Sequence, residues 1–170
     1  MRSTKPREGW RKAAGRRVLL RLVLFAALAG GLGAINLTVS GSWSAAIDVS
    51  NLQGGAGSDL IPSLESPLNV STLSVSQASG QNWQVSVRKI DGTWPAGLAM
   101  AVKRTSNGTG SGTIAGGTAY LNVTSVDQTF FTGYGGHSTI YLCFQLSGLS
   151  VQIPPSAYST TLVYTVVQTI

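Results

Sequence analysis

The 170-residue sequence contains little of what catalytic and metal-binding sites require. It has one cysteine, Cys143, one histidine, His137, and six acidic residues. A single cysteine excludes an intramolecular disulfide framework. A lone histidine with no second histidine or cysteine near it gives no metal-ligand spacing. The acidic residues are scattered singly, whereas glycoside hydrolysis and calcium binding need grouped carboxylates. We therefore expect no metal and no cofactor.

Candidate nucleophiles are also few. The nucleophile-elbow pattern G-x-S-x-G does not occur. A Ser-His-Asp triad around His137 stays open as an alternative, because triads assemble from distant positions, but the stretch "TGYGGHS" favours a polar turn residue. Cys143 lies in phase with Tyr141 and Gln145 and has no basic neighbour in sequence to activate its thiol, so we interpret it as structural. The sequence predicts a protein that is not an enzyme.

Positive charge is concentrated at the N-terminus. Eight of the twelve Lys and Arg residues precede residue 22, and from residue 35 onward four basic residues stand against five acidic ones, a net charge of −1. A nearly neutral body lacks the electrostatic footprint of phosphate binding, so nucleic acid is not an expected partner.

The basic residues precede "VLLRLVLFAALAGGLGA", an apolar stretch that ends in small residues. This layout predicts an export signal over residues 1–34, with cleavage candidates after Ala29 and Ala34. A retained membrane anchor is the alternative, but the uninterrupted apolar run of 13 residues is shorter than the roughly 20 needed to span a bilayer. "GRRVLLR" also resembles a twin-arginine signal. We expect export by a Sec or twin-arginine route to a secreted or cell-surface location, with membrane contact only through the leader.

Beyond the leader, short alternating runs are separated by Gly, Ser, Asn and Pro clusters, which is typical of an all-β sandwich. Alternation places Trp83, Val85 and Val87 on one face of a strand. The phase of "LNVSTLSVS" changes between Val70 and Leu73, which predicts a bulge or a short break. The pattern predicts a single antiparallel β-sandwich domain over residues 35–170, with roughly seven to nine strands.

The run "INLTVSGSWSAAIDV", residues 35–49, alternates over fifteen residues. As one strand it would be about 50 Å long at 3.3 Å per residue, whereas a typical strand is about 17–20 Å. Two explanations remain open. The chain bends at Gly41 and crosses from one sheet to the other, or Ile35, Leu37 and Val39 fill a groove in a neighbouring subunit by strand addition.

The C-terminal run "YSTTLVYTVVQTI" is apolar on both phases, as expected for a strand covered on both sides. In the strand-addition hypothesis this strand borders the groove, and its predicted interface residues are Leu162, Tyr164 and Val166.

Aromatic residues near predicted loops suggest a different function. Exposed rings of Trp94, Phe131 and Tyr134 would stack on sugars, which makes a secreted carbohydrate-binding module the alternative to a structural role. Against this, alternation requires at least one of Phe130 and Phe131 to face the core.

The ending "IPPSAYSTTLVYTVVQT", in which a proline turn and a tyrosine lead into a strand of alternating Thr and Val, carries a family resemblance. With the export signal and the Gly/Ser/Thr-rich hairpins, it resembles the secreted spore coat protein U and fimbrial-subunit group of bacterial β-sandwich proteins. The matching positions are Pro155, Tyr158, Val163, Thr165 and Val167.

The resemblance implies an immunoglobulin-like, pilin-like sandwich that acts as a structural or adhesive subunit of a cell-surface filament or coat. The implied partners are other copies of the chain or related surface subunits, and in some relatives a periplasmic chaperone and usher. The chain departs from typical pilins because it lacks their paired cysteines.

Overall fold

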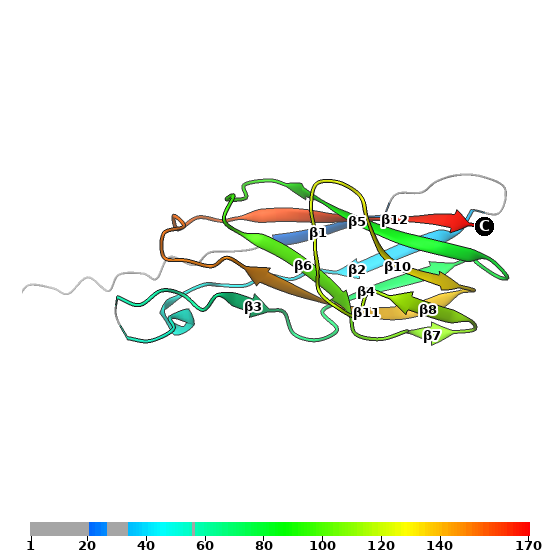
Figure 1. Ribbon diagram of the computed structural model, residues 1–170, viewed down its shortest axis with the longest axis horizontal. Coiled ribbons are helices and arrows are strands. Elements are labelled where there is room, and N and C mark those ends of the chain that lie inside the picture. Colours follow the sequence, from blue (N-terminus) through cyan, green and yellow to red (C-terminus); the bar gives the residue numbers. More distant parts are fainter. Residues whose placement is uncertain (1–20, 27–33, 56) are drawn as a thin grey trace, which may run out of the picture.

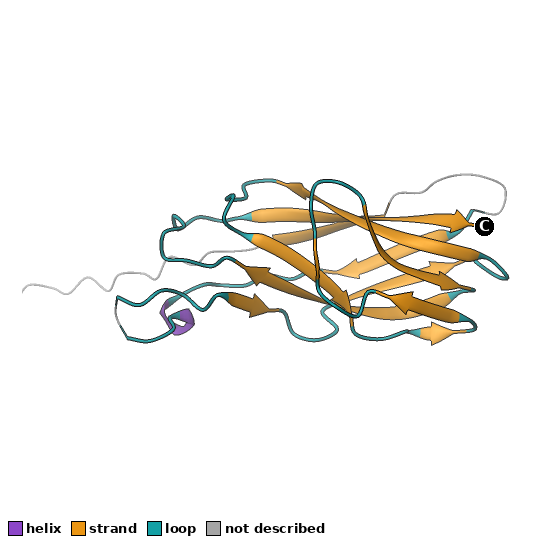
Figure 2. Cartoon of the chain, in the orientation of Figure 1, coloured by secondary structure: helices purple, strands orange, loops and turns teal. Residues whose placement is uncertain are grey.

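The computed structural model describes residues 21–26, 34–55 and 57–170, which form two β-sheets (Figure 1). The helical element of the described residues is one 3₁₀ turn, η1 (Val49–Asn51), drawn in purple in Figure 2. The expected all-β sandwich is confirmed.

Sheet A has the strand order β1-β12-β5-β10-β8. Parallel pairing occurs between β1 and β12, and the other neighbours in this sheet are antiparallel. The strands are β1 (Arg21–Ala26), β5 (Asn82–Asp91), β8 (Thr113–Gly116), β10 (Gln128–Tyr134) and β12 (Ser159–Thr169).

Sheet B has the order β2-β4-β11-β6-β9, and β3 and β7 also pair with β11. All of its described pairs are antiparallel. The strands are β2 (Asn36–Gly41), β3 (Ser63–Glu65), β4 (Ser71–Ser76), β6 (Ala99–Arg104), β7 (Thr109–Gly110), β9 (Leu121–Asn122) and β11 (His137–Ser147).

The described residues after residue 34 form eleven strands, more than the roughly seven to nine expected. Seven described strands of six or more residues follow residue 34, namely β2, β4, β5, β6, β10, β11 and β12. The strands β3, β7, β8 and β9 have two to four residues, too few for a period of two to be recognised. The phase change between Val70 and Leu73 is a short break, because β4 begins only at Ser71.

Alternation decides which side chains fill the interior between the sheets. In β5, Trp83, Val85 and Val87 have no exposed surface, whereas the residues between them are half-buried. The facing sheet contributes Leu73 from β4 and Phe144 from β11. Since sandwich cores form where two inner faces interdigitate, the predicted inward phase of β5 is confirmed.

Strand β10 departs from strict alternation. Its pairing with β5 shifts register between Thr129 and Phe131, which leaves Phe130 as an extra residue in a β-bulge. Both phenylalanines are buried, at 4% and 1% exposed surface. The bulge lets two consecutive aromatic rings enter the same core, which alternation alone forbids.

The fifteen-residue alternation at 35–49 is not one strand. Strand β2 ends at Gly41, whose φ of +100° suits glycine and where a Cβ atom would lie 2.5 Å from the carbonyl oxygen of Val70. Residues 42–48 form no strand, yet Trp43 is buried and stacks on Phe144 with ring centroids 6.5 Å apart. Strand β2 therefore ends at Gly41, where the first explanation places a bend, but the residues that follow do not join sheet A as a strand, which that explanation requires.

Most of the expected export signal lies outside the described residues. Within it, residues 21–26 form β1 and Ala34 precedes β2, while the other cleavage candidate, Ala29, is not described. The described residues contain no helix that is long and apolar enough to cross a membrane.

Candidate functional site

The residues predicted to dock into another subunit lie in their own sheet. Strand β2 pairs with β4, with Leu37 opposite Val75 and Val39 opposite Leu73. Ile35 and Leu37 are 8% and 5% exposed and belong to the protomer's core, and Val39 packs against that core. Burial of each such side chain stabilises the fold by about 1.5–3 kcal/mol. This segment is therefore already paired and buried within its own protomer. The docking prediction assumed that it was free to pair with another subunit, and that assumption is wrong for the protomer.

Strand β12 supplies the other half of the predicted interface. Leu162, Tyr164 and Val166 face the core, and Leu162 and Tyr164 have no exposed surface. Burial raises the pKa of the Tyr164 phenol, and its hydroxyl has no hydrogen-bond partner among the described residues. Strand β12 was expected to be buried on both faces, and this is true of only part of it. On its outer face Val163 is buried, but Val167 is 45% exposed.

The two edges of β12 differ. Along one edge, ten residues from Thr160 to Thr169 pair with β5. Along the other edge, Ser159–Tyr164 pair with β1 in parallel register. The strand beside this second edge is therefore residues 21–26, not residues 35–39 as the docking hypothesis has it.

The position of β1 connects the predicted export signal with the C-terminal strand. β1 belongs to the segment predicted to be removed on export, yet it pairs with the C-terminal strand and also lies beside β2. Without β1, six residues of β12 would present unpaired backbone N–H and C=O groups along a sheet edge. Such an edge is a template for pairing with another chain.

Two of the three predicted sugar-stacking rings pack against other residues of the protein. Phe131 is fully enclosed and meets Trp83 edge-to-face, with centroids 5.9 Å apart. This corrects the expectation of an exposed ring, and its physical cause is the β10 bulge. Trp94 packs against the core, donates its indole N–H to the carbonyl oxygen of Leu98 at 2.9 Å, and has Lys89 Nζ 5.5 Å from its ring centroid.

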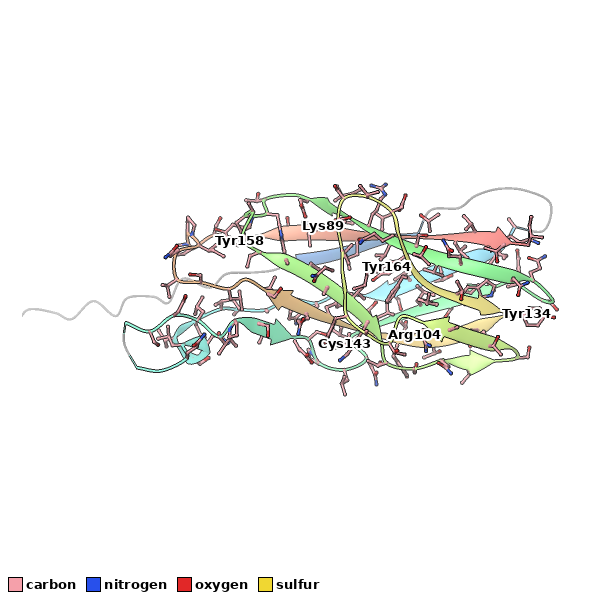
Figure 3. All side chains as sticks on the ribbon, in the orientation of Figure 1. Lys89, Arg104, Tyr134, Cys143, Tyr158 and Tyr164 are labelled. Carbon is pink, nitrogen blue, oxygen red and sulfur yellow. The ribbon has the colours of Figure 1, made fainter. Side chains whose placement is uncertain are left out.

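Tyr134 is the exposed member of the set, at 44%. It ends β10, on the outer face of sheet A, and borders an open groove together with Asn82 and Thr132. Figure 3 shows Tyr134 at the end of the molecule where Figure 1 marks the C-terminus, while Tyr158 lies toward the opposite end. The structure thus does not bring Trp94, Phe131 and Tyr134 together into one aromatic site.

Cys143 is buried on the outward phase of β11, where alternation alone would expose it. Its Sγ lies 3.3 Å from Tyr120 Oη and 3.5 Å from Ser66 Oγ, and Lys103 Nζ lies 4.2 Å from the Tyr120 ring centroid. Burial, followed by the hydrogen bond with Cys143, raises the pKa of Tyr120, so the phenol stays neutral. The cover over the thiol comes from distant loops, and no local signal predicts it.

His137 is the first residue of β11 and is buried, which corrects its interpretation as a turn residue. Its Nδ1 lies 3.1 Å from the carbonyl oxygen of Asn107, and its ring meets Trp83 edge-to-face at 6.2 Å. Arg104 donates a hydrogen bond to the Asn107 side chain, and burial lowers the Arg104 pKa. Strands β6 and β11 thereby both bind the loop that contains Asn107. His137 belongs to this packing arrangement.

The end of the sandwich near Tyr158 contains a small apolar hollow of about 50 Å³. A cavity of this size holds a water molecule or a methyl group rather than a sugar ring. Its wall includes Ile47, Leu60, Leu146 and Ile153. In the described part of the chain, no group of three or more His, Cys, Asp or Glu side chains is arranged to hold a metal ion.

Neither the protein-family models nor the curated proteins include a match to this chain.

Proposed function

We propose that the protein is an exported, non-enzymatic structural or adhesive subunit of a cell-surface filament or coat, and that its copies associate by β-strand pairing at the β12 edge. The observation that carries the proposal is the parallel pairing of β1 with β12. It revises the strand-addition hypothesis, because the acceptor edge remains β12 but the segment 35–39 stays within its own protomer.

The proposal rests on two properties of the β1 position. First, β1 comes from "RLVLFA", inside the segment whose layout predicts removal on export. Second, its partner edge on β12 spans Ser159–Tyr164, and this segment includes the core residues Leu162 and Tyr164. Removal of β1 would leave an edge that favours an apolar strand from a partner, because backbone hydrogen bonds then supply affinity and side-chain pockets supply register.

The partner in this proposal is another copy of the chain or a related surface subunit. Some of the fimbrial relatives that the chain resembles use a periplasmic chaperone, and in this proposal such a chaperone would protect the same edge during export. An unprotected edge of this kind promotes uncontrolled association. A heterologous contact, in which the β12 edge of one subunit pairs with a different edge of the next, builds open filaments or layers.

The test compares the full chain with the processed chain, residues 35–170. We expect the processed chain to form larger species in size-exclusion chromatography with light scattering, and rods or layers in negative-stain microscopy. A peptide of residues 20–27, with lysines appended for solubility, should bind the processed chain and reduce this association.

A matched control peptide carries Leu24→Pro, which removes one backbone donor and disfavours a paired strand. It should neither bind nor block. Circular dichroism confirms that the processed chain keeps its sheet content. If the folded processed chain stays monomeric and ignores both peptides, the β12 edge is not an association surface and the proposal fails.

A further inference from the structure

The outer face of sheet A carries a row of uncharged polar side chains around Tyr134. Strand pairing places Tyr134 opposite Asn82 of β5 and opposite Thr113 of β8. Asn82 is in turn opposite Thr169 of β12. Because residues directly opposite in a sheet share a face, these four side chains form one row across four strands.

A second row runs parallel to the first. Thr132 of β10 lies opposite Ala115 of β8 and Gln84 of β5, and Gln84 lies opposite Val167 of β12. Trp83, which lies between the two rows in β5, is fully buried on the inner face. Both rows therefore face outward. We call the surface formed by the two rows the Tyr134 face.

The Tyr134 face is hollowed. An open groove of about 310 Å³ runs over it, and ligand sites start at about 300 Å³. The Trp83 ring lies beneath the groove, on the inner face of the sheet, and is held by its N–H bond to the carbonyl oxygen of Gly135 at 2.7 Å. A Cβ atom at Gly133 would lie 2.3 Å from that ring, so glycine is required there. The groove thus lies on paired strands that a buried ring supports from the inner face.

The chemistry of the groove selects against charged ligands. Its polar side chains are a phenol, an amide and hydroxyls, from Tyr134, Asn82 and three threonines, and no charged side chain lines it. The basic residues of the described body lie elsewhere, for example Lys103 over Tyr120 and Arg104 in the interior. An anion would find no cation in this groove, and an apolar strand would leave the polar groups unpaired.

We propose that the Tyr134 face binds a neutral saccharide. The exposed Tyr134 ring packs against the C–H face of one sugar unit, and Asn82 and Thr132 exchange hydrogen bonds with its hydroxyl groups. This function goes beyond strand pairing. It also uses a separate surface, because β1 pairs with β12 only up to Tyr164, whereas the groove meets β12 at Thr169.

The test is isothermal titration calorimetry of the purified full chain with cellotetraose, chitotetraose, xylotetraose and maltotetraose, each to about 10 mM, because single-ring sites bind weakly. We expect binding of at least one of these probes. Tyr134→Ala should weaken it about tenfold, and Tyr134→Phe should keep it within about threefold, because stacking depends on the ring.

A matched pair of variants distinguishes saccharide binding in the groove from binding elsewhere on the protein surface. Thr132→Arg places a long charged side chain in the groove and should abolish binding, whereas Thr129→Arg, on the same strand but outside the groove, should leave it unchanged. Thermal unfolding verifies that each variant is folded. Absence of binding to all four probes, or equal binding by wild type and folded Thr132→Arg, overturns the proposal. Self-association that Thr132→Arg abolishes also overturns it, since the face is then a contact between copies.

Discussion

The two N-terminal strands of this protein, β1 and β2, each lie at one edge of a sheet but differ in how they are held. β2 pairs with β4 and buries Ile35 and Leu37 in the core of its own chain. β1 is the edge strand of sheet A and pairs in parallel with β12, far away in sequence. Parallel strands require a long connection, so β1 is joined to its partner by nearly the whole chain. β2 is thus an integral part of the fold, while β1 occupies the position that our proposal assigns to a strand from another subunit.

The most severe test of this comparison is Leu37→Arg. Leu37 is 5% exposed, so the substitution places a charge in the core, and we expect a loss of about 4 kcal/mol in the free energy of unfolding. Urea denaturation followed by circular dichroism measures it. Thr38→Arg, at the neighbouring exposed position, is the control and should change stability by less than about 0.5 kcal/mol. Equal stability of the two variants would mean that β2 is not integral.

Removal of residues 1–34 should have a smaller effect on stability. We expect a loss of about 1 kcal/mol, because β1 adds edge hydrogen bonds to a sheet that β5, β10 and β12 already form. At a protein concentration low enough to keep the processed chain monomeric, amide hydrogen exchange should become faster at Ser159–Tyr164, which pair with β1, and stay slow at Asn82–Asp91. A cooperative loss of protection across both sheets would contradict the distinction between the two strands.

The smallest effect concerns a loop contact remote from both strands. Asp59 accepts hydrogen bonds from the backbone N–H groups of Val151 and Leu60, at 2.8 Å each, and these bonds lower its pKa. A lowered pKa in the folded state contributes stability that is present above the ordinary value of 3.8 and is lost as the pH falls through the folded value. Protection of the Val151 amide, measured as the intrinsic exchange rate divided by the observed rate at the same pH, should therefore fall below about pH 4.

Asp59→Asn supplies the control for this pH effect. The variant keeps the shape of the side chain and an acceptor oxygen but cannot titrate, so the protection of Val151 should not change with pH over the same range. A pH dependence that persists in the variant would assign the effect to another group.

Periodicity predicted the strands that have enough residues to display it. The inward phase of β5 and β11 follows from alternation, because side chains on a pleated strand point to opposite faces. Phe131 could not be placed in this way, since the bulge in β10 shifts the phase by one residue and depends on pairing with β5. Of the proposed sugar contacts, Tyr134 is exposed as predicted. Its neighbours Asn82 and Thr169 join it only through strand register.

By itself the sequence determined that the described body is β-sheet, and which side chains face inward in a regular long strand such as β5, because a period of two is a local property of the chain. Only the tertiary structure decided which edges meet: β2 with β4, residues 21–26 with β12, and Tyr120 over Cys143. The physical reason is that backbone N–H and C=O groups are the same at nearly every residue. The residues of a strand edge therefore do not indicate which strand it will pair with. The pairing is decided by which arrangement of strands buries their inward faces together.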